Sequence, residues 1–164
     1  MLQHHRTLRL ITFILTAILS VSFLEGTLAW AEPEKPTKLV TRPNERHFIR
    51  KVTQSSTPKD KNTVIESRVD ISRDIRDIND GKAKKGSESG VVTWTVNGRT
   101  YGTHTDGQLY PLSGSGFHQL NRSAYKALGV YNKFGDTKDA KAILDNMKVS
   151  SSDRDAALKA YKAG

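Results

Sequence analysis

The chain contains no cysteine among its 164 residues, and this absence excludes several kinds of site. Without thiols the protein has no disulfide, no cysteine-ligated metal, no thiol nucleophile and no cysteine that carries a lipid. Aromatic residues are also scarce, at 7% of the sequence. We therefore expect the fold to be stabilised by burying most of its apolar residues in one small core.

The spacings of familiar catalytic and metal sites are missing as well. A glycine-rich loop is present, and it is a candidate phosphate-binding loop because glycine lets backbone N–H groups approach an anion. Its residues are Ser113, Gly114, Ser115 and Gly116. The loop lacks the lysine and threonine spacing of a nucleotide-binding loop, and a hinge would require glycine just as much. Ser115 lacks the flanking spacing of a serine hydrolase, and no two histidines have helical metal-ligand spacing, so we expect no metal and no cofactor.

The first residues have the features of a targeting segment. Met1–Arg9 is short and basic, and Leu10–Leu24 is a run of fifteen residues without a charge. That run is shorter than the ~20 apolar residues of a transmembrane helix. Small residues at Ala29 and Ala31 match a signal-peptidase site. The pattern predicts a signal peptide at 1–31 that is cleaved after Ala31, a secreted or periplasmic protein, and no membrane span after cleavage. The alternative is an uncleaved N-terminal anchor.

Positive charge is concentrated in residues 32–62. This stretch holds four of the five prolines and few large apolar residues, so it is predicted to be a disordered basic arm. Its apolar pairs, Leu39-Val40 and Phe48-Ile49, are candidates for local docking. Between Lys35 and Lys61, eight basic residues face only two acidic ones, Glu45 and Asp60, and are predicted to bind anions. The eight are Lys35, Lys38, Arg42, Arg46, Arg50, Lys51, Lys59 and Lys61.

Residues 63–81 have the pattern of an amphipathic helix. Thr63 and Glu66 have the spacing of a capping box, and Gly81 is placed to end the helix. The apolar positions that would line one stripe of the helix are Val64, Ile71, Ile75 and Ile78. Residues 82–90, which are mostly lysine, glycine and serine, are predicted to be a flexible joint.

Residues 91–112 predict a three-stranded antiparallel meander. Asn97-Gly98 and Asp106-Gly107 are dipeptides that favour two-residue hairpin turns. Counting pairs outward from both turns places alternate residues on one face. The face that we expect to be buried carries Val92, Trp94, Val96, Tyr101, Tyr110 and Leu112. The opposite face includes His104, Leu109 and Pro111, and Pro111 requires its strand to lie at an edge of the sheet.

Three short helices are predicted after the glycine-rich loop. The residues expected to begin or end them are Asn121 and Gly135 for the first, Asp136 or Thr137 for the second, and Ser151 or Ser152 for the third. Strands followed by helices indicate the α+β class, with the helices covering the Trp94 face of the meander. The chain is thus expected to end in a small α+β domain at 91–164.

The placement of charge favours a non-catalytic function. Residues 86–164 hold ten basic and seven acidic groups, a net +3, whereas residues 35–61 of the arm alone hold +6. Our first hypothesis is an exported interaction module that its arm tethers to an anionic surface or polymer. Lipid headgroups, envelope polymers and nucleic acid are all compatible partners, because such binding does not read sequence. The sequence identifies no protein partner.

The alternative hypothesis is a small secreted ribonuclease or toxin-like effector. Two imidazoles and a cation can cleave RNA without a metal, one imidazole acting as base and the other as acid. His104 and His118 are the candidate pair, and Arg122 is the candidate cation that stabilises the charge on phosphorus. Two ordinary surface histidines near turns would give the same pattern.

Overall fold

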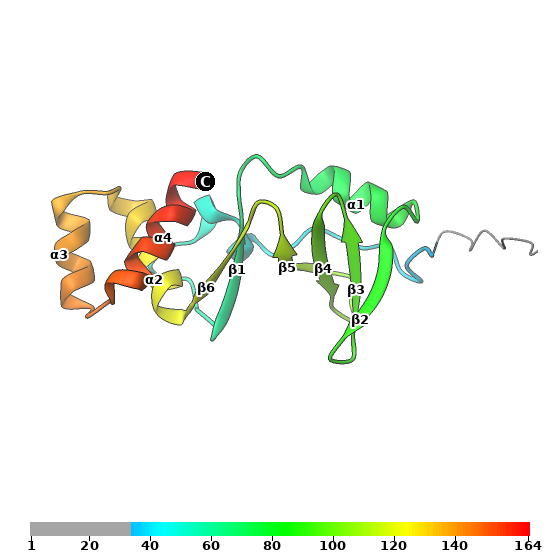
Figure 1. The fold of residues 1–164 in the computed structure, drawn as a ribbon, viewed down its shortest axis with the longest axis horizontal. Coiled ribbons are helices and arrows are strands. Elements are labelled where there is room, and N and C mark those ends of the chain that lie inside the picture. Colours follow the sequence, from blue (N-terminus) through cyan, green and yellow to red (C-terminus); the bar gives the residue numbers. More distant parts are fainter. Residues whose placement is uncertain (1–33) are drawn as a thin grey trace, which may run out of the picture. The chain divides into compact units, whose positions relative to one another are not determined.

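The computed structural model describes residues 34–164, so the predicted signal peptide at 1–31 lies outside the described residues. The described chain belongs to the predicted α+β class, with four α-helices and two antiparallel sheets (Figure 1). The helices are α1 (Ile71–Asn79), α2 (Arg122–Phe134), α3 (Lys138–Asn146) and α4 (Ser151–Ala163). The strands are β1 (Lys61–Ile65), β2 (Lys84–Glu88), β3 (Val91–Val96), β4 (Arg99–Thr103), β5 (Leu109–Gly114) and β6 (Phe117–Asn121). Within 34–164, no helix is long and apolar enough to cross a membrane.

The predicted meander forms, with an additional strand at one edge. Strands lie in the order β2-β3-β4-β5, and the first of them comes from the predicted flexible joint at 82–90. Every residue of β2 is exposed, so no apolar alternation marks it in the sequence. Ser89 and Gly90 both have positive φ, at 50° and 80°, which makes the tight turn into β3. Pro111 lies on β5, an edge strand, as its missing N–H requires.

The register between β3 and β4 is as predicted, with Trp94 paired with Tyr101. Between β4 and β5 the pairing is irregular at Thr100/Tyr101, and over Tyr101–Thr103 it is shifted by one residue, so that Thr103 pairs with Leu109 and not with Tyr110. Where the register slips by one residue, side chains move to the opposite face. Leu109 is consequently buried, at 1% exposure, and Tyr110 lies on the other face.

The slip has its cause in the second turn, which is wider than the predicted two-residue turn. The His104 N–H donates to Gln108 O at 2.9 Å, and the Gly107 N–H donates to His104 O at 2.9 Å. The side chain of Asp106 accepts from the Gln108 N–H at 2.9 Å, so the aspartate stabilises this wider loop. The expected burial of Val92 is also wrong, because its exposed fraction is 41%.

Residues 63–65 form part of a strand, which corrects the helix predicted over 63–81. β1 pairs antiparallel with β6, and helix α1 begins only at Ile71, where Asp70 caps it. The run Thr63-Val64-Ile65 is β-branched, a composition that favours a strand over a helix. The end of the helix is as predicted, with Gly81 at φ 80° just beyond it.

The β1–β6 ribbon lies between two hydrophobic cores. Val64 belongs to a core shared with α2, α3 and α4, whereas Ile65 belongs to a core shared with α1 and the four-stranded sheet. Adjacent residues of a strand point to opposite faces, so this ribbon contributes to both cores. We call them the helical core, which includes Leu128 and Leu144, and the sheet core, which includes Trp94.

The three C-terminal helices begin and end close to where they were predicted. Asn121 caps α2, Thr137 caps α3 and Ser150 caps α4, each accepting from a backbone N–H of the first turn. The helices do not cover the Trp94 face, which corrects the predicted architecture. They pack beside β1 and β6, and α1 covers the four-stranded sheet (Figure 1).

The predicted disordered arm at 32–62 is corrected over residues 40–62, which fold against both cores. Val40, Ile49 and Val52 are buried, with exposed fractions of 3%, 1% and 1%. The side-chain amide of Asn132 on α2 donates to the carbonyls of Ile49 and Val52 at 2.6 and 2.8 Å. Prolines exclude long helices from this segment, but its few apolar residues are enough to dock it. Residues 34–39 carry no helix or strand.

A buried carboxylate joins α1 to the sheet. Asp74 is fully buried and accepts from Arg99 Nε at 2.7 Å, from Asn97 Nδ2 at 2.8 Å and from the Tyr101 hydroxyl. Burial opposes ionisation of Asp74, but these hydrogen bonds outweigh it and hold the pKa of Asp74 below its ordinary value. Burial and the adjacent carboxylate raise the pKa of Tyr101.

Candidate anion-binding site

A cleft of about 650 Å³ lies between the segment 44–63 and the outer strands of the sheet. We call it the basic cleft. The charged or titratable residues among its lining are Arg46, His47, Lys59, Lys61, Glu88 and His104. Glu88 is the only acidic group among these lining residues, so the cleft presents positive potential to an approaching anion.

Arg46 is held in place at this cleft by a buried amide. Its Nη2 donates to Asn62 Oδ1 at 2.6 Å, and Asn62 is only 2% exposed. The same amide accepts from the Lys59 N–H at 2.8 Å and donates to the Lys59 carbonyl at 2.6 Å. Asn62 therefore fixes both the guanidinium and the backbone of the neighbouring lysine. Within residues 34–164, the buried Nε of Arg46 has no hydrogen-bond partner.

His47 has a defined tautomer in the cleft. Its Nδ1 lies 2.8 Å from the Thr63 carbonyl oxygen, which can only accept, so Nδ1 carries the proton and Nε2 has the free lone pair. Burial lowers the pKa of His47, and the charges of Arg46 and Lys59 lower it further. The ring is consequently neutral at neutral pH.

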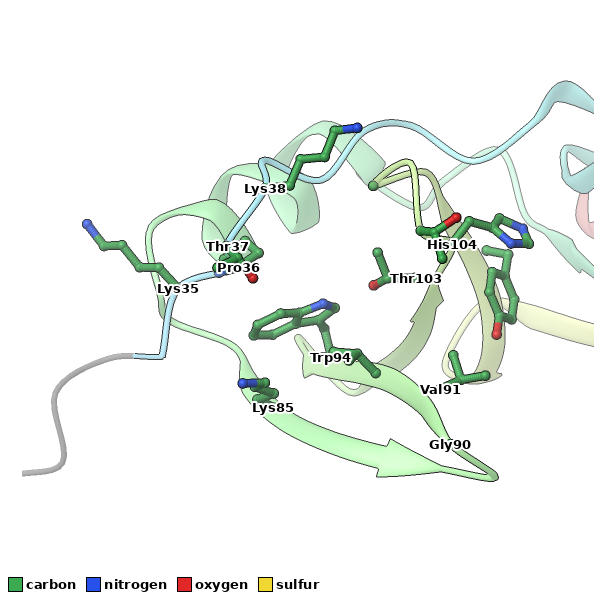
Figure 2. A pocket seen from close by; sticks show the side chains of 14 residues that line it. Lys35, Pro36, Thr37, Lys38, Lys85, Gly90, Val91, Trp94, Thr103 and His104 are labelled. Atoms are coloured by element: carbon green, nitrogen blue, oxygen red, sulfur yellow. The ribbon is translucent and has the colours of Figure 1, made fainter.

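A second cavity, of about 520 Å³, adjoins the basic cleft, and we call it the Trp94 pocket. Its lining combines the segment 35–38 with β2, β3 and the turn after β4. Lys35, Lys38 and Lys85 stand at its rim, and Figure 2 shows the amino groups of the first two extending outward. Lys85 also pairs with Glu34 at 3.2 Å. The lining includes no acidic residue.

Two buried polar atoms of the Trp94 pocket have no hydrogen-bond partner among the described residues. They are the indole Nε1 of Trp94, whose side chain is 2% exposed, and the hydroxyl of Thr103. Figure 2 shows the indole nitrogen and the hydroxyl turned toward each other across the cavity. A buried donor without a partner costs about 1–3 kcal/mol, so this pair is suited to a ligand that supplies an acceptor.

His104 and Tyr110 line both cavities and form the border between them. Their ring centroids lie 4.6 Å apart, with an interplanar angle of 38°. Tyr110 packs directly over Gly102, where an added Cβ would collide with the phenol ring. The β4–β5 register shift puts Tyr110 on this face, which is why the sequence pattern did not reveal its role.

The structure does not bring the predicted catalytic histidines into one cavity. His104 lines both cavities, whereas His118 lies on β6 and donates from Nε2 to Glu66 Oε1 at 2.8 Å. Glu66 also accepts from Arg68, and these hydrogen bonds lower the pKa of Glu66. Arg122 pairs with the exposed Asp60 at 3.1 Å. The residue that joins His104 in the basic cleft is His47, which lies within the predicted arm at 32–62.

The eight basic residues predicted to bind anions fall into two groups. Those that line the basic cleft or the Trp94 pocket are Lys35, Lys38, Arg46, Lys59 and Lys61. The other three contact the protein itself: the Arg42 guanidinium lies 4.4 Å from the Phe48 ring centroid, Arg50 donates to Gly164 O at 2.6 Å, and Lys51 pairs with Glu45 at 4.0 Å. Their folded positions depend on the docking of residues 40–62.

The glycine-rich loop forms the β5–β6 connection. Ser113 and Gly114 end β5, and the Ser115 N–H already donates to Gly98 O at 3.2 Å. Gly116 has φ 79°, and its carbonyl accepts from the Glu66 N–H at 2.9 Å. Ser113 also lines the basic cleft. These backbone contacts give the loop the role of a tight connection between the two sheets.

No family model, curated protein or solved structure matches the chain. Among residues 34–164, no group of three or more histidine, aspartate or glutamate side chains is placed to hold a metal ion. The function is therefore inferred from the basic cleft and the Trp94 pocket themselves.

Proposed function

We propose that this protein is an exported, non-catalytic module that binds an anionic polymer in the basic cleft. The observation that supports the proposal is the convergence of Arg46, Lys59 and Lys61, with His104 beside them, on one cleft of the folded chain. In this form of the hypothesis the arm does not act as a free tether. It supplies one wall of the cleft, with its charges held at fixed positions.

The cations of the basic cleft differ in how rigidly their side chains are held. Arg46 is pre-positioned by Asn62 and can present its guanidinium to a phosphate or carboxylate with little loss of side-chain entropy. Lys59 and Lys61 are exposed and act as flexible point charges. Binding of this kind depends on neutralising successive charges of a polymer, so salt should weaken it steeply.

The direct test replaces the two exposed lysines in the full chain. Deletion of residues 32–62 is unsuitable, because it would remove Val40, Ile49 and Val52 from the two cores. The double variant Lys59→Gln/Lys61→Gln should weaken binding of a short linear polyphosphate and reduce the slope of log K against log salt by roughly 0.7–0.9 for each lysine. Fluorescence anisotropy of labelled polyphosphate across a salt series gives both quantities.

The matched control is Lys159→Gln/Lys162→Gln on α4, which makes the same change of net charge outside the cleft. It should leave the salt slope at the wild-type value. Equal slopes for the two double variants would show that binding follows net charge alone, and the proposed cleft would be rejected.

RNA cleavage without a metal is a second candidate function, because His47 and His104 line the same cleft. The free Nε2 of a neutral His47 has the lone pair that a general base needs. In this candidate His104 acts as the acid and Arg46 stabilises the charge on phosphorus. His118 was the partner expected from the sequence, and its hydrogen bond to Glu66 occupies one of its ring nitrogens.

The test is cleavage of a short RNA in EDTA by the full chain and its histidine variants. His47→Ala and His104→Ala should each abolish a bell-shaped pH profile, whereas His118→Ala should leave it unchanged. Loss of cleavage in His118→Ala but not in His47→Ala would show that His104 acts with His118, the pair expected from the sequence. No cleavage by the wild-type chain, or cleavage that survives all three substitutions, would exclude the enzyme.

A further inference from the structure

The floor of the Trp94 pocket is polar but uncharged. Its unpartnered groups within the described chain are the Trp94 indole N–H and the Thr103 hydroxyl, and the indole side chain is 98% buried, given its 2% exposed fraction. An indole N–H can only donate, so the complementary ligand atom is an acceptor. A charge placed there would be buried without a cation beside it, which is costly. The group that fits the floor is therefore a neutral one, such as a carbonyl.

The rim of the same pocket is cationic. Lys35, Lys38 and Lys85 line it with no acidic residue in the lining, and Lys85 pairs with Glu34 just outside it. A ligand that satisfies both ends carries a neutral acceptor inside the pocket and a negative charge outside it. Its cross-section must also suit a cavity of about 520 Å³.

The mouth that joins the pocket to the basic cleft is aromatic. His104 and Tyr110 line both cavities with their rings 4.6 Å apart, and His104 is exposed. Aromatic side chains interleaved with lysine and arginine along a groove are characteristic of single-strand nucleic-acid binding, where bases stack and phosphates follow the cations. An acidic polysaccharide would use the cations but has no planar ring to stack on this pair.

We infer that the Trp94 pocket takes one base of a single-stranded nucleic acid, whose phosphates lie along the rim lysines and continue into the basic cleft. This inference rests on the proposed function and names its polymer. A ring carbonyl of the base accepts from the Trp94 indole N–H, and the Thr103 hydroxyl donates to the same edge of the base. The lysines hold the backbone phosphates without reading the sequence.

The experiment uses the full chain with Trp30→Phe, which leaves Trp94 as the only tryptophan. Four probes are titrated: an oligothymidylate, an abasic oligonucleotide of the same length, a short linear polyphosphate and polygalacturonate. The readouts are the affinity and the indole N–H cross-peak in a ¹H–¹⁵N correlation spectrum. The oligothymidylate should shift the indole cross-peak, and the other three should leave it in place. The abasic strand should bind at least about fivefold more weakly, because each stacked base contributes about 1–3 kcal/mol.

Thr103→Val is the matching variant, since it replaces the hydroxyl by a methyl group of similar size. It should weaken oligothymidylate several-fold and leave polyphosphate binding unchanged. Thr95→Val on β3 is the control, because Thr95 is exposed and does not line the pocket. A Thr95→Val variant that loses as much affinity as Thr103→Val would overturn the assignment of the hydroxyl.

The outcomes separate the inference from the function on which it rests. If polyphosphate binds as tightly as oligothymidylate, or if the indole cross-peak does not move, the base site is wrong and the anion cleft stands. If polygalacturonate binds and oligothymidylate does not, the polymer is an acidic polysaccharide and the nucleic-acid assignment is rejected. If none of these polyanions binds, the proposed function fails as well.

Discussion

The helical core and the sheet core belong to one chain but are stabilised by different interactions. The helical core is built from aliphatic and tyrosine side chains, and each of its three helices begins at a side-chain cap. The sheet core packs against Asp74, a fully buried carboxylate whose partners come from β4 and from the β3–β4 turn. The two buried polar atoms of the Trp94 pocket that have no hydrogen-bond partner among the described residues also lie on the sheet side. The difference places the buried ion pair of Asp74 and Arg99, and with it the Trp94 pocket, on the side of the four-stranded sheet.

The largest effect should come from breaking the carboxylate network. Asp74→Ala leaves the Arg99 guanidinium, which is only 14% exposed, without its partner, and we expect a loss of about 3–5 kcal/mol in the free energy of unfolding. Urea denaturation measures the loss. Asp77→Ala is the control, because Asp77 lies on the same helix and pairs with exposed cations. Similar losses in both variants would contradict the special role of Asp74.

The matching change in the helical core is Leu128→Ala, which should cost about 2–5 kcal/mol through the cavity that it leaves. Its effect should not depend on pH, since the side chain is surrounded by apolar groups.

The effect of Asp74→Asn on the free energy of unfolding should depend on pH. The pKa of Asp74 is lowered in the fold, so its stabilisation is present above its ordinary value of 3.8 and is lost as the pH falls below it. Urea denaturation at neutral and at acidic pH distinguishes the two cores.

Docking of residues 40–62 on α2 can be disrupted at a single glycine. A Cβ at Gly129 would lie 2.6 Å from the Thr53 carbonyl oxygen, and backbone cannot give way as a flexible side chain can. Gly129→Ala should therefore lower stability by about 1–3 kcal/mol, although alanine is the better helix former. Ala142→Gly on α3 is the control, because it measures the difference in helix propensity between alanine and glycine at an exposed position without this contact. A stabilised Gly129→Ala would show that the segment does not lie on the helix.

The smallest effect should come from His47 and its titration. Burial lowers the pKa of this ring, so the unfolded chain binds the proton more tightly than the folded chain does. Stability should consequently decline as the pH falls below the ordinary histidine value of 6.5, and His47→Gln should reduce that decline. Thermal unfolding across this pH range measures it. If the stability of His47→Gln declined with pH as steeply as that of the wild type, a group other than His47 would be responsible for the decline.

The sequence predicted the elements of the helical core better than those of the sheet core. The bounds of α2 follow from Asn121 and Gly135, because caps and apolar spacing are local signals. The register of β5 was missed because it depends on a turn whose width is set by hydrogen bonds between His104 and Gln108, not by the Asp106-Gly107 dipeptide alone. Strand β2 was missed because all its side chains are exposed.

The candidate site could be predicted only in part. Charge counting found Arg46, Lys59 and Lys61, which the structure brings to one cleft. It could not show that they belong to a folded wall, because docking of the arm depends on contacts with α1 and α2, which are distant in sequence. The Trp94 pocket had no sequence signal, since its lining joins the segment 35–38 to β2, β3 and the turn after β4, which are distant from it in sequence.

The most direct test of the account is amide hydrogen exchange over residues 40–52 of the full chain, because the basic cleft exists only if this segment is docked. The Val40 N–H donates to Asn79 Oδ1 at 2.8 Å, the Thr41 N–H to Gly107 O at 3.0 Å and the Val52 N–H to Ile49 O at 3.2 Å. We predict that these amides exchange far more slowly than those of an unstructured chain. Exchange at the unstructured rate across the segment would show a free tether and would contradict both cavities.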